Sequence, residues 1–168
     1  MWRNVMKGVH MTATVVARKP AVGEAYWVLG GLYEVKVSSE ESDGELVVMH
    51  MTMPAGLGPP PHTHPGNEAV YVLDGTLRYY IGDDTLEGEP GSFFYVPAGT
   101  WENFEPTSTC RVLVEYLPGK DIDKFFAEIG EPATTRELPP ATTPPPDVDR
   151  IIAVGARYGL EMRPPQGT

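Results

Sequence analysis

The sequence predicts an all-β fold built from short strands, and two observations support this prediction. Glycine and proline contribute 18 residues each to a chain of 168, and this content favours many strands joined by turns over long helices. In addition, short segments rich in β-branched and aromatic residues recur between turn-forming residues, as is typical of strands. The predicted strands are Ala25–Leu29, Leu32–Val37, Glu45–Met53, Ala69–Leu73, Thr76–Ile81, Ser92–Val96 and Cys110–Leu117.

Several of these strands are apolar on both faces. In the predicted strand at residues 69–73, Val70 and Val72 face one way, while Tyr71 and Leu73 face the other. A strand that is buried on both sides fits a double-layered barrel, or a barrel whose outer face is covered by a second subunit. We therefore expect a homodimer that pairs through the barrel exterior.

The last third of the chain predicts two short helices separated by a proline-rich linker. Apolar residues recur with helical periodicity in residues 121–129, and Gly130 follows as a stop signal. Residues 131–146 are rich in proline and threonine, Asp147 suits a helix N-cap, and a second helix is predicted at Val148–Tyr158. The predicted organisation is an N-terminal arm at 1–24, a β-barrel at 25–120 and a helical C-terminal part at 121–168.

The net charge of −10 limits the classes of partner. An acidic surface repels nucleic-acid phosphates and anionic lipid headgroups, so we expect neither nucleic acid nor membrane as a partner. No apolar stretch approaches the ~20 residues that span a bilayer, and the N-terminus lacks the hydrophobic core of a signal peptide. A cytoplasmic location is therefore expected. The single cysteine, Cys110, lies in an apolar segment and is expected to be buried.

The segment at residues 56–75 combines side chains that can bind a metal ion. His62 and His64 are two positions apart, so on an extended segment both imidazoles point toward one place. Three prolines stiffen the approach, and the turn at residues 65–67 returns the chain so that Glu68 can reach the same place. A His-x-His pair alone often occurs by chance, but two imidazoles with one carboxylate suit divalent Fe, Mn, Ni, Cu or Zn. The sequence therefore predicts a metal site at His62, His64 and Glu68.

The same segment resembles the first conserved motif of the cupin superfamily. That motif places a glycine, a His-x-His pair, a glutamate and a second glycine at fixed spacing. The matching residues here are Gly56, His62, His64, Glu68 and Gly75. Part of the second cupin motif is matched by Gly91, Pro97 and Gly99. The resemblance implies a cupin double-stranded β-helix, which is a jelly-roll barrel, with a metal ion inside its mouth.

The second motif departs from the family at the position of the fourth ligand. Where the family carries a histidine this chain has Glu102, and Pro106 replaces the family's asparagine. If Glu102 is the fourth ligand, the set of two histidines and two glutamates favours Fe, Mn or Zn, with Ni or Cu as further options. Glu102 could instead act as an uncoordinated catalytic base, or turn away so that only three ligands remain. A shift of the strand register by one residue would make Asn103 point inward in place of Glu102.

Inward-facing side chains beside the metal are expected to form an apolar, aromatic pocket for a small-molecule ligand. Tyr79, Phe104 and Tyr116 are the candidate pocket residues. The chain resembles single-barrel cupins such as quercetin dioxygenase-like proteins and cupins of aromatic polyketide pathways. That resemblance implies a metal-dependent, dioxygenase-like enzyme acting on a small phenolic or enolic molecule, with Glu102 as ligand or catalytic base. The alternatives are isomerase or cyclase chemistry, a non-catalytic small-molecule-binding cupin, and a structural or interaction protein.

Overall fold

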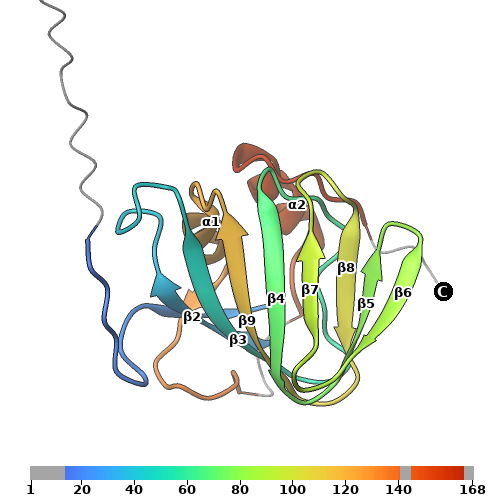
Figure 1. Cartoon of the computed structure of the whole chain (residues 1–168), viewed down its shortest axis with the longest axis horizontal. Coiled ribbons are helices and arrows are strands. Elements are labelled where there is room, and N and C mark those ends of the chain that lie inside the picture. Colours follow the sequence, from blue (N-terminus) through green and yellow to red (C-terminus); the bar gives the residue numbers. More distant parts are fainter. Residues whose placement is uncertain (1–13, 141–144, 165–168) are drawn as a thin grey trace, which may run out of the picture.

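Two β-sheets form the protein in the computed structural model, which describes residues 14–140 and 145–164 (Figure 1). The larger sheet has seven strands in the order β10-β1-β2-β3-β9-β4-β7, and the smaller sheet has three in the order β6-β5-β8. All neighbouring strands run antiparallel. The strands are β1 (Ala25–Val28), β2 (Gly31–Val37), β3 (Val47–Met53), β4 (Asn67–Asp74), β5 (Leu77–Ile81), β6 (Asp84–Gly88), β7 (Phe93–Val96), β8 (Glu102–Pro106), β9 (Cys110–Leu117) and β10 (Glu131–Pro132).

The core is built from side chains that alternate along the strands. In β3, Met49, Met51 and Met53 are at most 3% exposed, while the residues between them are only half-buried. The neighbouring strand β9 continues the pattern, because Val114 lies opposite Met49 and is equally buried. A period of two residues is what one buried sheet face requires. Cys110, at the start of β9, is a buried free thiol, as predicted.

The predicted all-β fold with short C-terminal helices is confirmed. Each predicted strand overlaps a strand of the structure, with bounds that differ by at most two residues. In the described part of the chain, β6, β8 and β10 have no predicted counterpart. The strands β6 and β8 are rich in acidic residues and lack a regular apolar alternation. β10 is two residues long within the predicted linker, and its pairing with β1 is a tertiary contact that local sequence does not encode.

The prediction that β4 is buried on both faces is wrong for the single chain. Val70 and Val72 face the core, but Tyr71 and Leu73 on the opposite face are 43% and 42% exposed. No other part of the described chain covers them, so the outer face of β4 is an open apolar surface. The other interpretation of the sequence pattern, a face covered by a second subunit, stays a prediction.

Helices α1 (Ile122–Ile129) and α2 (Val148–Arg157) lie toward one end of the barrel, the upper end in Figure 1. The predicted N-cap of α2 is confirmed, because the Asp147 side chain accepts the Arg150 N–H at 3.0 Å. The two helices are joined where the Tyr158 hydroxyl donates to Glu128 at 2.9 Å. The domain bounds stay a prediction, since residues 1–13 of the arm and 141–144 of the linker lie outside the described residues.

The part of the chain that the structure describes contains no helix that could span a membrane. Neither α1 nor α2 is long and apolar enough to cross a bilayer. The cytoplasmic location stays a prediction.

Candidate metal centre

The segment that carries the two histidines is held by hydrogen bonds on both of its sides. On one side it pairs with the start of β8, where His62 and Glu102 exchange both backbone bonds at 2.9 and 2.8 Å. On the other side it pairs with the C-terminal segment, where the Thr63 N–H donates to the Glu161 carbonyl at 2.8 Å. This double pairing places His62 and Glu102 directly opposite each other, although they are far apart in the sequence.

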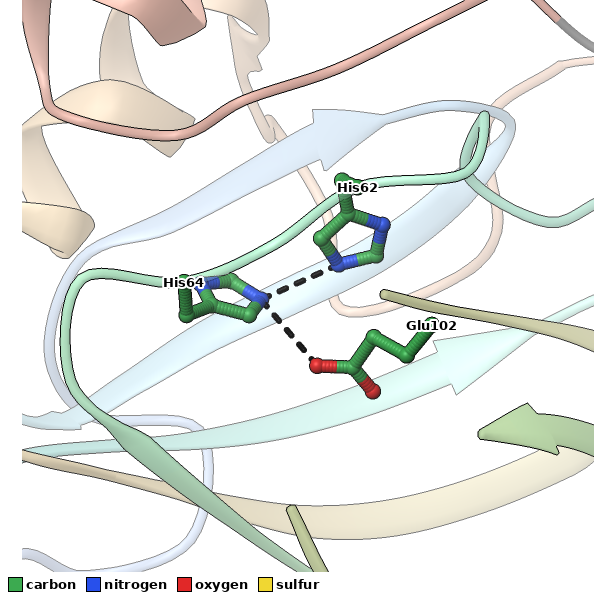
Figure 2. Close-up of side chains that lie close together, drawn as sticks. All are labelled: His62, His64 and Glu102. Atoms are coloured by element: carbon green, nitrogen blue, oxygen red, sulfur yellow. Dashed lines mark hydrogen bonds and ion pairs between the residues drawn. The ribbon is translucent and has the colours of Figure 1, made fainter. Parts of the chain in front are cut away.

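The two imidazoles face each other through their Nε2 atoms. These atoms are 3.0 Å apart in His62 and His64, and Figure 2 shows both rings on one stretch of chain with Glu102 beside them. The Nδ1 of His62 lies 2.9 Å from the Pro60 carbonyl oxygen, which can only accept a hydrogen bond. Nδ1 therefore carries the proton, and Nε2 keeps the lone pair that a metal needs. Burial, followed by the charge of His64, lowers the pKa of His62 to about 4, so this imidazole is neutral at pH 7.

Two buried carboxylates complete the group. Glu68 places Oε2 at 3.0 Å and Glu102 places Oε1 at 3.8 Å from His64 Nε2. One nitrogen or oxygen from each of His62, His64 and Glu102 lies within 4.8 Å of the others. Glu102 points inward and is 2% exposed, so Asn103 does not take its place. The structure thus brings together the four side chains that the sequence analysis gave as candidate metal ligands.

The pKa values of the two carboxyl groups are shifted in opposite directions. Burial, followed by the charge of Glu68, raises the pKa of Glu102 to about 9. For Glu68, burial alone would raise the pKa, but the charge and hydrogen bond of His64 outweigh it and lower the pKa. In the metal-free protein at pH 7, Glu68 is therefore the carboxylate and Glu102 the protonated acid. Two carboxyl groups that are this close and this well buried do not both ionise unless a cation lies between them.

The donor set fits a divalent metal ion. It offers two imidazole nitrogens and two carboxyl groups, all of them buried. Glu102 Oε1 is enclosed and has no hydrogen-bond partner among the described residues. A buried oxygen without a partner is costly, and a cation at the histidine nitrogens would satisfy it. His62, His64, Glu68 and Glu102 are thus the residues that would hold the ion.

A cavity with mainly apolar walls lies next to these side chains. Phe104 and Tyr116 line it, together with His62, His64 and Glu68, whereas Tyr79 and Glu102 are not among the lining residues. Tyr79 instead points its hydroxyl at the two glutamates from the far side. The remaining lining residues are Leu29, Tyr33, Met51, Pro59, Phe125, Phe126, Ile129, Ile151, Leu160 and Met162.

The C-terminal part forms the roof of this cavity. Phe125 comes from α1, Ile151 from α2, and Leu160 and Met162 from the segment that follows α2. Sequence reasoning missed these residues as pocket components. The helical periodicity around Phe125 signals an apolar face, but only the folded chain shows that this face covers the metal site. The cavity has about 410 Å³ of atom-free space including its opening, and the centre of a water molecule can reach about 30 Å³ of it.

Comparisons with known proteins agree with this architecture. The profile of the Cupin domain family matches residues 49–116. The chain is 26% identical over 113 residues to quercetin 2,3-dioxygenase of Bacillus subtilis (strain 168). That match covers 66% of this chain but 34% of the enzyme, so the chain spans about a third of the length of this curated relative.

Solved structures with a similar fold include two at low sequence identity. An RmlC-like cupin from Shewanella frigidimarina NCIMB 400 superposes with a TM-score of 0.58 at 13% identity, over 67% of this chain and 99% of that one. The oxalate decarboxylase of Lactobacillus farciminis, as its formate complex, gives a TM-score of 0.56 at 17% identity, over 66% of this chain and 35% of that one. At these identities the likeness shows the fold alone.

Proposed function

Because this chain is a cupin-superfamily protein with the jelly-roll fold, we propose that it is a metal-dependent, dioxygenase-like enzyme for a small phenolic or enolic molecule. The observation that carries the proposal is the convergence of two imidazoles and two glutamates beside a cavity with apolar walls. These residues would hold a divalent metal, which would supply Lewis acidity that lowers the pKa of a ligand hydroxyl. The two carboxyl groups favour Fe, Mn or Zn as that metal.

The cavity walls favour an uncharged aromatic ligand. Among the described residues that line the cavity, none is a lysine or an arginine, so a ligand carboxylate would have no cation to pair with except the proposed metal ion. Phe104, Tyr116 and Phe125 offer aromatic surfaces against which a flat ring can pack. The space that a water molecule can reach holds roughly two waters. A ligand of aromatic size would therefore enter only if side chains that line the cavity moved aside.

Glu102 is the proposed proton acceptor in this reaction. Its Oε1 has no hydrogen-bond partner among the described residues. Because the raised pKa keeps Glu102 protonated at pH 7 in the metal-free protein, it can accept a proton only after a bound cation has caused it to ionise. In this role Glu102 takes the proton of the ligand hydroxyl, while Glu68 and the two histidines hold the metal. If Glu102 is instead a fourth ligand, the same oxygen binds the metal and the proton must leave by another group.

Metal analysis combined with O2 uptake tests the proposed function. We expect the purified protein to contain stoichiometric Fe, Mn or Zn and to consume O2 when a flavonol such as quercetin is added. Replacement of His62 by alanine should abolish both properties, because it removes one of the two nitrogen donors. The matched control is His50→Ala, which removes a histidine that is paired with Glu34 at 2.7 Å outside the site. This control should keep metal and O2 uptake.

Other outcomes separate the competing functions. A protein without stoichiometric metal, whose unfolding and O2 uptake do not respond to added Fe, Mn or Zn, would contradict the proposal. Metal binding with conversion of the ligand in the absence of O2 would point to isomerase or cyclase chemistry. Metal and ligand binding without any conversion would point to a non-catalytic binding cupin.

We also propose that a second copy of the chain covers the open outer face of β4 and β7. On this face Phe93 and Tyr95 are 61% and 56% exposed, next to Tyr71 and Leu73. β7 is an edge strand of the larger sheet, so its outer backbone groups have no strand partner in the described chain. Since each chain carries a net charge of −10, two copies approach with the least repulsion through an uncharged strip.

Small-angle scattering tests this assembly. We expect the wild-type protein to have twice the mass of one chain, and the double substitution Phe93→Lys and Tyr95→Lys to give a monomer. The control is Arg78→Ala on β5, which removes a partly exposed side chain in the smaller sheet. A wild-type protein that stays monomeric at millimolar concentration would rule out the dimer.

A further inference from the structure

One tyrosine contacts both glutamates of the site from behind. Tyr79 lies on β5, has no exposed surface, and packs its ring edge-to-face against Phe94 and Phe104 at centroid distances of 5.0 and 5.9 Å. Its hydroxyl donates to Glu68 Oε1 at 2.7 Å and also contacts Glu102 Oε2. Because the two rings fix the phenol, the position of this hydroxyl is set by the core of the barrel.

The hydroxyl divides the four carboxyl oxygens into two pairs. It engages Oε1 of Glu68 and Oε2 of Glu102, which are the oxygens that face away from the histidines. The other oxygen of each group is the one nearest His64 Nε2, at 3.0 Å for Glu68 and 3.8 Å for Glu102. One phenol thereby turns one oxygen of each carboxyl group toward the imidazole nitrogens.

We propose that Tyr79 is a positioning residue that orients Glu68 and Glu102 for metal binding, an inference that rests on the proposed metal site with Glu102 as its fourth ligand. The terminal torsion of a glutamate is soft, so without a fixed donor each carboxyl group would rotate among several orientations. Hydrogen-bond partners of this kind change metal affinity by about 10- to 100-fold. Tyr79 thus acts through the ligands, which agrees with its place behind them and outside the cavity lining.

The test compares two tyrosine-to-phenylalanine substitutions on β5. Tyr79→Phe removes the hydroxyl between the glutamates, and Tyr80→Phe removes a neighbouring hydroxyl that is 3.5 Å from Glu105 on the opposite side of the strand. Titration calorimetry with Zn²⁺ should show binding weakened about 10- to 100-fold for Tyr79→Phe and unchanged for Tyr80→Phe. The visible absorption bands of bound Co²⁺ should also change for Tyr79→Phe alone, because they report the geometry of the ligands.

The outcomes separate this inference from the proposed function. If the wild type binds neither Zn²⁺ nor Co²⁺, the metal site itself fails and the role of Tyr79 falls with it. If the wild type binds both ions and Tyr79→Phe keeps the same affinity and spectrum, only the role of Tyr79 is overturned.

A measurement on the wild type covers the case in which Tyr79→Phe does not fold. The Tyr79 ring can be assigned by nuclear magnetic resonance from its proximity to Phe94 and Phe104. Its Cζ resonance should shift when Zn²⁺ is added, since a bound cation draws electron density from Glu68 and Glu102, the two partners of the Tyr79 hydroxyl. A Cζ resonance that does not respond to bound Zn²⁺ would overturn the inference.

Discussion

Replacement of Gly75 by alanine is expected to destabilise the protein by about 3 kcal/mol or more. Gly75 has a φ of +73°, which an L-residue rarely adopts. A Cβ atom there would also lie 2.1 Å from the Thr109 carbonyl oxygen and 2.8 Å from Cys110 Cα. Both contacts are backbone atoms, so the turn after β4 would have to move away from the start of β9. Urea-induced unfolding followed by circular dichroism measures the loss.

Gly82→Ala is the matched control for this prediction. Gly82 also has a positive φ, of +58°, but a Cβ atom there would meet nothing within 4 Å. Alanine at this position should therefore lower the free energy of unfolding only by the cost of a positive φ for an L-residue, about 1 kcal/mol. If the two variants lose the same free energy of unfolding, the close approach of the Thr109 and Cys110 backbone to Gly75 does not matter for stability. The other glycines of the two cupin motifs share positive φ angles and open surroundings, and they are Gly56, Gly91 and Gly99.

The stability of the metal-free protein is expected to fall as the pH rises from 6.5 to 9, and Glu102→Gln should remove this fall. The pKa of Glu102 is about 9 in the folded chain against an ordinary value of 4.5, so over this interval the folded state holds a proton that the unfolded state has released. Folding stability therefore decreases with rising pH, by at most about 3 kcal/mol between pH 6.5 and 9. Because a glutamine stays neutral, the stability of the Glu102→Gln variant should not show this decrease with pH.

His62 acts in the opposite direction but in a different pH range. Its pKa is about 4 in the folded chain against 6.5 as the ordinary value, so its contribution to stability is lost as the pH falls below 6.5. Above pH 6.5 the effect of Glu102 can thus be measured separately from that of His62. Urea unfolding at pH 6.5, 7.5 and 8.5 with a chelator present gives the slopes. Glu105→Gln, at an exposed position of the same strand, should keep the wild-type slope. Parallel slopes for wild type and Glu102→Gln would contradict the prediction.

Most of the strand pattern could be predicted from the sequence because burial on one sheet face imposes a period of two. The alternation of Met49, Met51 and Met53 is such a signal, and these residues line the core. Strands without a buried face gave no signal of this kind. β6 is exposed over four of its five residues, and its place is fixed by pairing with β5 and not by its own composition.

The roof of the cavity could not be predicted for a related reason. An amphipathic pattern shows that a helix has an apolar face, but it does not say which surface that face will cover. The patterns around Phe125 and Ile151 therefore indicate two apolar helix faces without specifying the surface that each face covers. The folded chain settles this, because both side chains line the cavity beside His64.

The sequence by itself predicted His62, His64 and Glu68 as members of the candidate metal centre and left open whether Glu102 joins them. The spacing of His62 and His64 makes their side chains point the same way, and Glu68 and Glu102 stand at fixed positions of recurring motifs. Tertiary structure alone decided how these groups are held. Tyr79, on β5 of the smaller sheet, reaches Glu68 on the larger sheet and Glu102 on the adjacent strand β8. Glu102 meets His62 through backbone pairing across 40 positions of the chain. Local sequence encodes the direction of a side chain, whereas the distance between two strands is set by the packing of the whole barrel.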